Sequence, residues 1–292
     1  MRHGFSGGGA KAIAGVAALA AFLFSTNAWA ELGQPRNWQL GFQEAATPIM
    51  RQLTLFHDFL LILCTVVTLF VLALLVYVAL RFNENANPKP STTSHHTLLE
   101  IAWTVVPILI LVVIAVPSFR LLFAQYDFPK ADVTVKAIGN QWYWTYEYPD
   151  NGNMTFDAVI VEDEELKPGQ PRLLATDNDI VVPVNKNIHV LITATDVLHN
   201  WTVPAFGVKV DAVPGRVIRT WFRAEKTGTF YGQCSELCGG RHAYMPIAVR
   251  VVSDQEYAEW LVKAKKEFAF APPADDGKSL QSPSPRLAQL EK

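Results

Sequence analysis

Two long apolar runs dominate the first half of the chain. Residues 59–80 hold 22 positions without a charged side chain, and residues 101–119 hold 19. As α-helices these runs would be about 33 Å and about 28 Å long, and the hydrocarbon core of a bilayer is about 30 Å thick. Pro107 and Pro117 lie in the second run, which suits a membrane helix whose neighbours satisfy the freed backbone groups. The pattern therefore predicts a two-helix transmembrane hairpin over residues 55–122.

From about Asp132 onward the pattern changes to alternating, β-branched runs separated by Gly, Pro, Asn and Asp. Such spacing is typical of an all-β sandwich or barrel. Ser253 and Glu256 then have the spacing of a capping box, which predicts a closing helix over 257–268. We expect a β domain over 123–268, followed by a disordered tail over 269–292 that is rich in Pro, Ser and Ala. The predicted strands lie in seven runs: 133–139, 141–148, 154–161, 179–185, 187–196, 217–225 and 247–252.

The N-terminal residues have the pattern of a secretory signal. Basic side chains precede an uncharged run over 12–24, and an Ala-x-Ala sequence ends at Ala30. We expect a cleaved signal peptide over residues 1–30, because a run this short does not span a bilayer as an uncleaved anchor would. Residues 31–54 would then be an extracytoplasmic segment, and two spans would return the β domain to the same side.

Composition sharpens this picture. Hydrophobic residues make up 50% of the chain and charged residues 18%, which is apolar for a soluble protein and agrees with a partly membrane-embedded one. The hairpin is therefore expected to lie in lipid. The formal net charge is −2 and no stretch forms a basic stripe, so we expect no nucleic-acid partner.

The candidate chemistry lies in the sequence CSELCGGRHAYM. It contains Cys234, Cys238, His242 and Met245, and His199 precedes the first cysteine by 35 residues. Outside the cytoplasm a C-x3-C pair alone could equally be a disulfide. The nearby imidazoles and thioether favour a metal site, because soft and borderline donors prefer copper and zinc rarely uses methionine. A mononuclear blue-copper site needs one cysteine fewer, and these donors suffice for two copper ions.

Three sequences together carry a resemblance to a known family. They are DVLHNW around the first histidine, GNQWYWTYEY at residues 139–148, and the cysteine sequence itself. From the first membrane helix through Val252, the chain closely resembles subunit II of haem–copper cytochrome c oxidases. The resemblance implies a cupredoxin-like β domain with a dinuclear copper (CuA) centre. It implies that the thiolates of Cys234 and Cys238 bridge the two coppers and that His199 and His242 each bind one copper. It also implies that Met245 is a weak thioether ligand and that Glu236 binds through its backbone carbonyl.

The resemblance also implies roles for residues whose chemistry alone is ambiguous. Trp142 would be the electron entry point, although an aromatic residue in an alternating strand can simply pack a core. Glu100 would stand at the mouth of a proton-uptake channel, although an acid at a helix N-terminus also favours the helix dipole. The Glu236 side chain would reach a Mg ion shared with the catalytic subunit.

Acidic residues are frequent between Glu147 and Asp179. They either form a solvated face or steer a basic partner by long-range attraction. Family members dock cytochrome c on acidic residues, and the positions that align with that set are Asp157, Asp177 and Asp196.

The resemblance implies an electron-transfer subunit of a terminal oxidase in the bacterial inner membrane, with the copper domain in the periplasm. It would accept electrons from cytochrome c and pass them to haem in subunit I, in a complex with subunit III that reduces O2 and pumps protons. A membrane-anchored copper chaperone is an alternative, but it would need only one copper and a domain with helices interleaved among strands. A quinol oxidase subunit would lack the copper ligands, and a nitrous oxide reductase would lack the hairpin.

Overall fold

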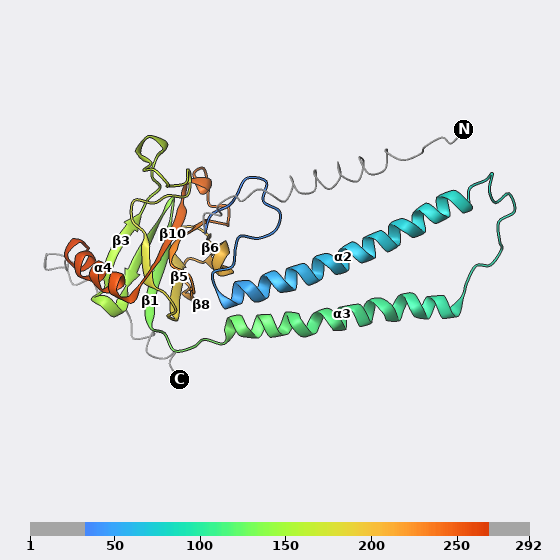
Figure 1. Cartoon of the computed structure of the whole chain (residues 1–292), viewed down its shortest axis with the longest axis horizontal. Coiled ribbons are helices and arrows are strands. Elements are labelled where there is room, and N and C mark those ends of the chain that lie inside the picture. The colour runs from blue at the N-terminus through green and yellow to red at the C-terminus, as the bar shows by residue number, and fades with distance from the viewer. Residues whose placement is uncertain (1–32, 269–292) are drawn as a thin grey trace, which may run out of the picture.

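The computed structural model describes residues 33–268, which form a helical hairpin and a β domain. Helix α2 (Pro48–Arg81) and helix α3 (Thr97–Tyr126) extend side by side away from the β domain (Figure 1). Both helices are long and apolar enough to cross a membrane, and they contain the two predicted spans. The expected signal peptide over 1–30 and the expected tail over 269–292 lie outside the described residues.

Both helices continue beyond the apolar runs toward the β domain. Helix α2 begins at Pro48, 11 residues before the first run, and α3 ends seven residues after the second. Thr47 caps α2, because its hydroxyl accepts the N–H of Met50 at 3.0 Å and donates to the carbonyl of Phe206 at 2.7 Å. The start of the hairpin is therefore hydrogen-bonded directly to the β domain.

The β domain consists of ten strands and a closing helix among the described residues. The strands form a five-stranded sheet in the order β3-β2-β1-β5-β8, a three-stranded sheet in the order β4-β10-β9, and the pair β6-β7. Strand β1 pairs antiparallel with β2 and parallel with β5. The bounds are β1 Val133–Asn140, β2 Tyr143–Tyr148, β3 Met154–Ala158, β4 Ile180–Pro183, β5 Ile188–Ala194, β6 His199–Val203, β7 Val208–Ala212, β8 Ile218–Phe222, β9 Gly228–Gln233 and β10 Pro246–Val252.

The predicted alternation is clearest in β2. Trp144, Tyr146 and Tyr148 are fully buried in the core, whereas the residues between them are only partly buried. Helix α4 (Asp254–Glu267) covers the sheet, with the ring of Trp260 5.3 Å from that of Tyr148. The predicted capping box is present, and α4 begins three residues earlier than the sequence predicts.

The seven predicted runs match seven of the strands, of which β1 and β10 each extend one residue beyond the run, whereas β6, β7 and β9 were not predicted. Strand β9 contains Gly228 and Gly232, and glycine weakens a strand pattern. The structure requires Gly232, because a Cβ there would lie 1.8 Å from the carbonyl oxygen of Thr202 in β6. This close approach brings β6 and β9 together, and both strands lead to the candidate site.

Candidate metal centre

Three elements bring the sulfur and imidazole donors to one edge of the β domain. His199 is the first residue of β6, Cys234 directly follows β9, and Met245 directly precedes β10. Strands β9 and β10 are antiparallel neighbours, so residues 234–245 are the loop between them. The N–H of Cys234 donates to the carbonyl of Met245 at 3.3 Å, which closes this loop.

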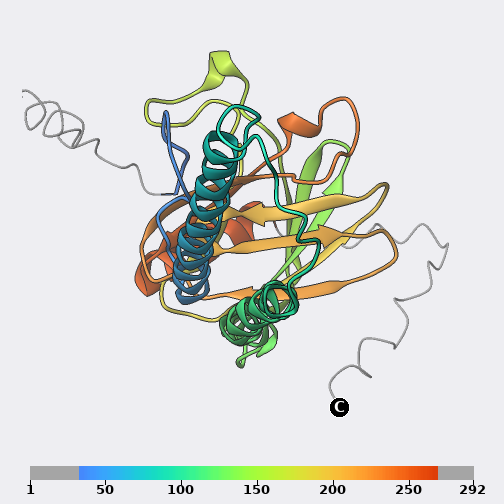
Figure 2. The same cartoon turned by 90° about the vertical axis from the view of Figure 1, so that its right-hand side faces the viewer.

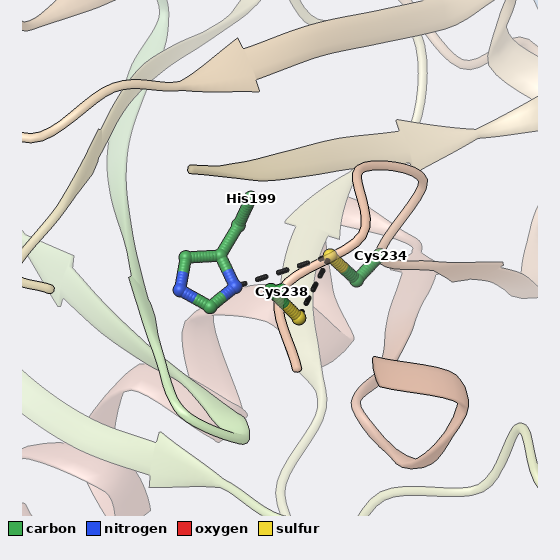
Figure 3. Close-up of side chains that lie close together, drawn as sticks. All are labelled: His199, Cys234 and Cys238. Atoms are coloured by element: carbon green, nitrogen blue, oxygen red, sulfur yellow. Dashed lines mark hydrogen bonds between the residues drawn. The ribbon is translucent and has the colours of Figure 1, made fainter. Parts of the chain in front are cut away.

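The donor atoms converge on the two thiols. Cys234 Sγ and Cys238 Sγ are 3.8 Å apart, and His199 Nδ1 lies 3.9 Å from Cys234 Sγ (Figure 3). His242 Nδ1 and Met245 Sδ each lie 3.5 Å from Cys238 Sγ. The donor atoms of His199, Cys234 and Cys238 all lie within 4.8 Å of one another, and His242 is outside that group. The two imidazoles therefore approach different ends of the thiol pair.

A backbone oxygen completes the cluster. The carbonyl of Glu236 lies 3.3 Å from Cys234 Sγ, while the residue itself is exposed on the loop. His199 is 0% exposed, Met245 1% and Cys238 3%, so these donors are withdrawn from water, whereas His242 is half-buried. The sulfur–sulfur distance of 3.8 Å is far longer than the disulfide bond length of about 2.05 Å, and both thiols are free.

The electrostatics of the thiol pair favour a bound cation. Burial tends to raise the pKa of the Cys234 thiol, but hydrogen bonds with His199 and the backbone outweigh burial and lower the pKa to about 7. Burial and the charge on Cys234 raise the pKa of Cys238 to about 12. Two thiolates this close therefore coexist only beside a compensating positive charge. The donor set fits a soft or borderline metal ion such as copper.

A carboxylate holds His199 from the side opposite the thiols. Asp196 Oδ1 lies 2.8 Å from His199 Nε2, which leaves Nδ1 facing Cys234. The carboxylate also accepts the N–H groups of Gln141 at 2.7 Å and Val197 at 2.6 Å. Burial would raise the pKa of Asp196, but these hydrogen bonds lower it below its ordinary value. Metal-bound histidines commonly have such a carboxylate partner.

Two side chains from the turn between β1 and β2 contact the metal loop. Trp142 Nε1 donates to the carbonyl of Cys238 at 3.1 Å, and Gln141 Nε2 donates to the same oxygen at 2.8 Å. Gly239 makes room for them, because a Cβ at its positive φ of +117° would lie 3.0 Å from the Trp142 ring. Neither the contact of Gln141 with the metal loop nor that of Asp196 with His199 was predicted. The D-x-x-H spacing in DVLHNW could have indicated the contact between Asp196 and His199.

The remaining predicted residues lie away from the donors. Asp157 and Asp177 are neighbours on the surface, because the amide of Asn178 donates to the carbonyl of Asp157 at 2.9 Å. Glu100 lies in the first turn of α3 and accepts the N–H of His96 at 3.3 Å. This turn is at the end of the hairpin far from the β domain (Figure 1).

Fold and donor set together define a class. In the described residues the strands follow one another with only single-turn 3-10 helices between them, unlike the interleaved helices expected of a thioredoxin-like chaperone. Buried Cys and Met donors on the loop between the last two strands, with histidine donors on that loop and on β6, are typical of copper sites. The protein is therefore a membrane protein with two spans and a cupredoxin-like domain.

Comparison with known proteins identifies the family. The model for the cytochrome c oxidase subunit II transmembrane domain matches residues 35–121, and the model for the periplasmic domain matches residues 133–252. The chain is 53% identical to the probable cytochrome c oxidase subunit 2 of Rickettsia bellii, over 85% of this chain and 91% of that protein. It is 46% identical to cytochrome c oxidase subunit 2 of Cereibacter sphaeroides, over 91% and 93%. The chain belongs to the cytochrome c oxidase subunit II family.

The chain is also similar to solved structures of cytochrome oxidase subunit II. The crystal structure of the periplasmic domain of subunit II of cytochrome oxidase from Bradyrhizobium japonicum is 61% identical and covers 48% of this chain and 99% of that chain, with a TM-score of 0.46. Family membership confirms the predicted resemblance, the hairpin followed by a cupredoxin-like domain, and a place in the haem–copper oxidase complex, an oxidoreductase. Together with the His199, Cys234 and Cys238 cluster, it indicates copper binding.

Proposed function

We propose that this chain holds a dinuclear CuA centre and passes electrons from cytochrome c to haem in subunit I. The observation that carries the proposal is a set of six donors, which are two neighbouring thiols and four donors around them, with one imidazole at each end of the thiol pair. A single tetrahedral ion takes four donors, so six donors support two ions. The residues that would hold the coppers are Cys234, Cys238, His199, His242, Met245 and, through its backbone carbonyl, Glu236.

The bound centre would supply one-electron redox chemistry, with charge shared over two metals and two sulfurs. The chain's contribution is to keep the donors fixed in both oxidation states. Asp196 orients the His199 ring, and the closed loop holds Cys234 opposite Met245. Burial of both thiols, His199 and Met245 keeps water away from that part of the site. A fixed and largely buried donor set supports rapid electron transfer because little rearrangement accompanies each step.

Trp142 is the proposed entry point for electrons. Its half-buried ring donates a hydrogen bond to the carbonyl of Cys238, so a single residue connects the aromatic ring to a ligand sulfur. Cytochrome c would dock around this ring on acidic residues. The proposed docking residues are Asp157, Asp177 and Asp196. The side chain of Asp196 is hydrogen-bonded to His199 and is still 30% exposed, so it remains accessible to a partner.

The test is stopped-flow reduction of the centre by cytochrome c in the purified oxidase complex. Trp142→Phe removes the hydrogen bond to Cys238 and should slow the reduction while copper content stays unchanged. Tyr143→Phe is the matched control, because Tyr143 is the adjacent aromatic residue and should leave the rate unchanged. Equal rates for both variants and the parent would reject Trp142 as the entry point.

The orientation and the remaining contacts complete the proposal. Cleavage after Ala30 would leave residues 31–54 and the β domain in the periplasm of a bacterium, beside subunits I and III. Glu100, at the far end of the hairpin, would stand at the cytoplasmic mouth of a proton-uptake channel.

The exposed Glu236 carboxylate would reach a Mg ion shared with subunit I. Replacement of that ion by Mn tests this contact, because Glu236→Gln should alter the Mn paramagnetic resonance spectrum.

A further inference from the structure

The segment before α2 forms a loop that leaves the β domain and returns to it. At one end the carbonyl of Gly33 accepts the N–H of Tyr231 at 2.8 Å, and at the other the N–H of Ala46 donates to the carbonyl of Ala205 at 2.9 Å. Between these ties the loop lies alongside the first turns of α2, as the dark blue segment in Figures 1 and 2 shows. Residues 34–45 are called the rim loop below.

The rim loop reaches the boundary of the first span. The ring of Phe42 lies 4.6 Å from the ring of His57, centroid to centroid. His57 is nine residues into α2 from Pro48, about 14 Å along the helix axis. It lies two residues before Phe59, where the uncharged run begins. The loop therefore extends from the β domain down to the depth at which the chain enters lipid.

Two large apolar side chains of this loop have almost no contact with the described part of the chain. Trp38 is 98% exposed and Leu40 is 97% exposed. The loop around them is held in shape, since the N–H of Arg36 donates to Gln39 Oε1 at 3.0 Å and the N–H of Gln39 donates to the carbonyl of Arg36 at 3.2 Å. Trp38 also has a φ of +58°, which is uncommon for a bulky residue. The fold thus presents both side chains outward.

We propose that the rim loop is an interfacial membrane anchor, with Trp38 and Leu40 immersed in the headgroup layer of the phospholipid leaflet nearest the β domain. Tryptophan is enriched at this depth because its ring is apolar and its N–H is polar. The charges on the rim loop also agree with contact to phospholipid headgroups. Arg36 lies beside Trp38 and is available to lipid phosphate, whereas the carboxylate of Glu44 is paired with Lys226 of the β domain at 2.5 Å.

The anchor would fix the height of the copper domain above the membrane. Both ends of the rim loop are hydrogen-bonded to the β domain, so a loop held at the interface limits movement of that domain toward or away from the lipid. Without the rim loop, only the start of α2 and the end of α3 would hold the β domain to the membrane. A third contact with the interface restricts its tilt as well, and this inference does not depend on the identity of the bound metal.

The test measures the lipid accessibility of a nitroxide label attached to Leu40→Cys in the oxidase complex, reconstituted into phospholipid vesicles. The complex also carries Cys64→Ser, which removes the exposed cysteine of the first span. Collisions with oxygen, which concentrates in lipid, are compared with collisions with a water-soluble nickel complex. Leu61→Cys in the span is the lipid control, and Glu164→Cys on the β domain is the water control. Trp38→Cys serves as a second label position in the same loop.

The expected ratio of oxygen to nickel collisions at Leu40 and Trp38 lies between those of the two controls and several-fold above that of Glu164. A ratio equal to that of Glu164 would place the loop in water and overturn the proposal. Low collision rates with both probes would also overturn it, because they would show that a neighbouring subunit covers the loop. The same measurement on the full chain alone in vesicles should give the intermediate ratio again.

Discussion

Replacement of Gly139 by alanine should displace His199 from the metal centre. A Cβ at Gly139 would lie 2.8 Å from His199 Cδ2 and 2.9 Å from Cγ, whereas ordinary contacts begin at 3.4 Å, so the ring must retreat by about 0.6 Å. Gly139 itself cannot easily move, because it lies in β1 between Trp144 of β2 and Ala194 of β5. Its φ is not positive, so alanine introduces no backbone strain of its own.

The size of the effect follows from this geometry. Overpacking of a buried site costs about 1–3 kcal/mol of unfolding free energy. Trp144 packs edge-on against the His199 ring at 6.0 Å and Asp196 holds its Nε2, so the ring has few ways to retreat that keep Nδ1 directed at Cys234. We expect copper affinity to fall about 10–100-fold, as when the partners of a metal ligand are disturbed.

The assay combines urea unfolding of the metal-free chain with a copper titration. Gly240→Ala is the matched control, since Gly240 lies in the metal loop, has no positive φ and has open space around its Cβ position. That variant should keep the stability and copper affinity of the parent. If Gly139→Ala also keeps both, the close packing of β1 against His199 does not position the ligand, and the reasoning fails.

Three further predictions concern the neighbours of the centre, its partner and the far end of the hairpin. Asp196→Asn should lower copper affinity about 10–100-fold, because an amide holds the His199 ring less firmly; unchanged affinity in a competition titration would contradict this role. The rate of electron entry from cytochrome c should fall about tenfold or more between low and high ionic strength, since salt screens attraction to the acidic surface; a salt-independent rate in stopped-flow mixing would reject steering. Glu100→Ala should slow steady-state oxidase turnover while reduction of copper stays fast, and unchanged turnover would reject a role in proton uptake.

The sequence predicted those features that depend on local pattern. The two spans follow from uninterrupted apolar runs, and the strands of the five-stranded sheet follow from alternation such as that in Trp144, Tyr146 and Tyr148. Strand β9 was missed because Gly228 and Gly232 break its pattern. Gly232 is needed because the backbone of β6 passes too close for a Cβ at this position, and this contact is visible only in the folded chain.

In the candidate site, the ligands that are close in sequence were predictable, whereas the contacts made only in the folded chain were not. Cys234, Cys238, His242 and Met245 are close in sequence, so their spacing indicated a metal loop. Gly139 was not predictable as a contact of the donor His199, because the two residues meet only when β1 and β6 are packed together. The pairing of Asp196 with His199 is local, but the same aspartate also fits a surface docking role, and only the geometry of its hydrogen bonds revealed the contact.

The presence of two coppers is tested most directly in the purified full-length chain in detergent, loaded with copper and freed of excess metal. Metal analysis and electron paramagnetic resonance of the same sample report how many coppers bind and whether they share one unpaired electron. We expect two coppers per chain and a seven-line hyperfine pattern, because the electron would couple equally to two copper nuclei. One copper per chain, or a four-line pattern from a single nucleus, would contradict the dinuclear centre.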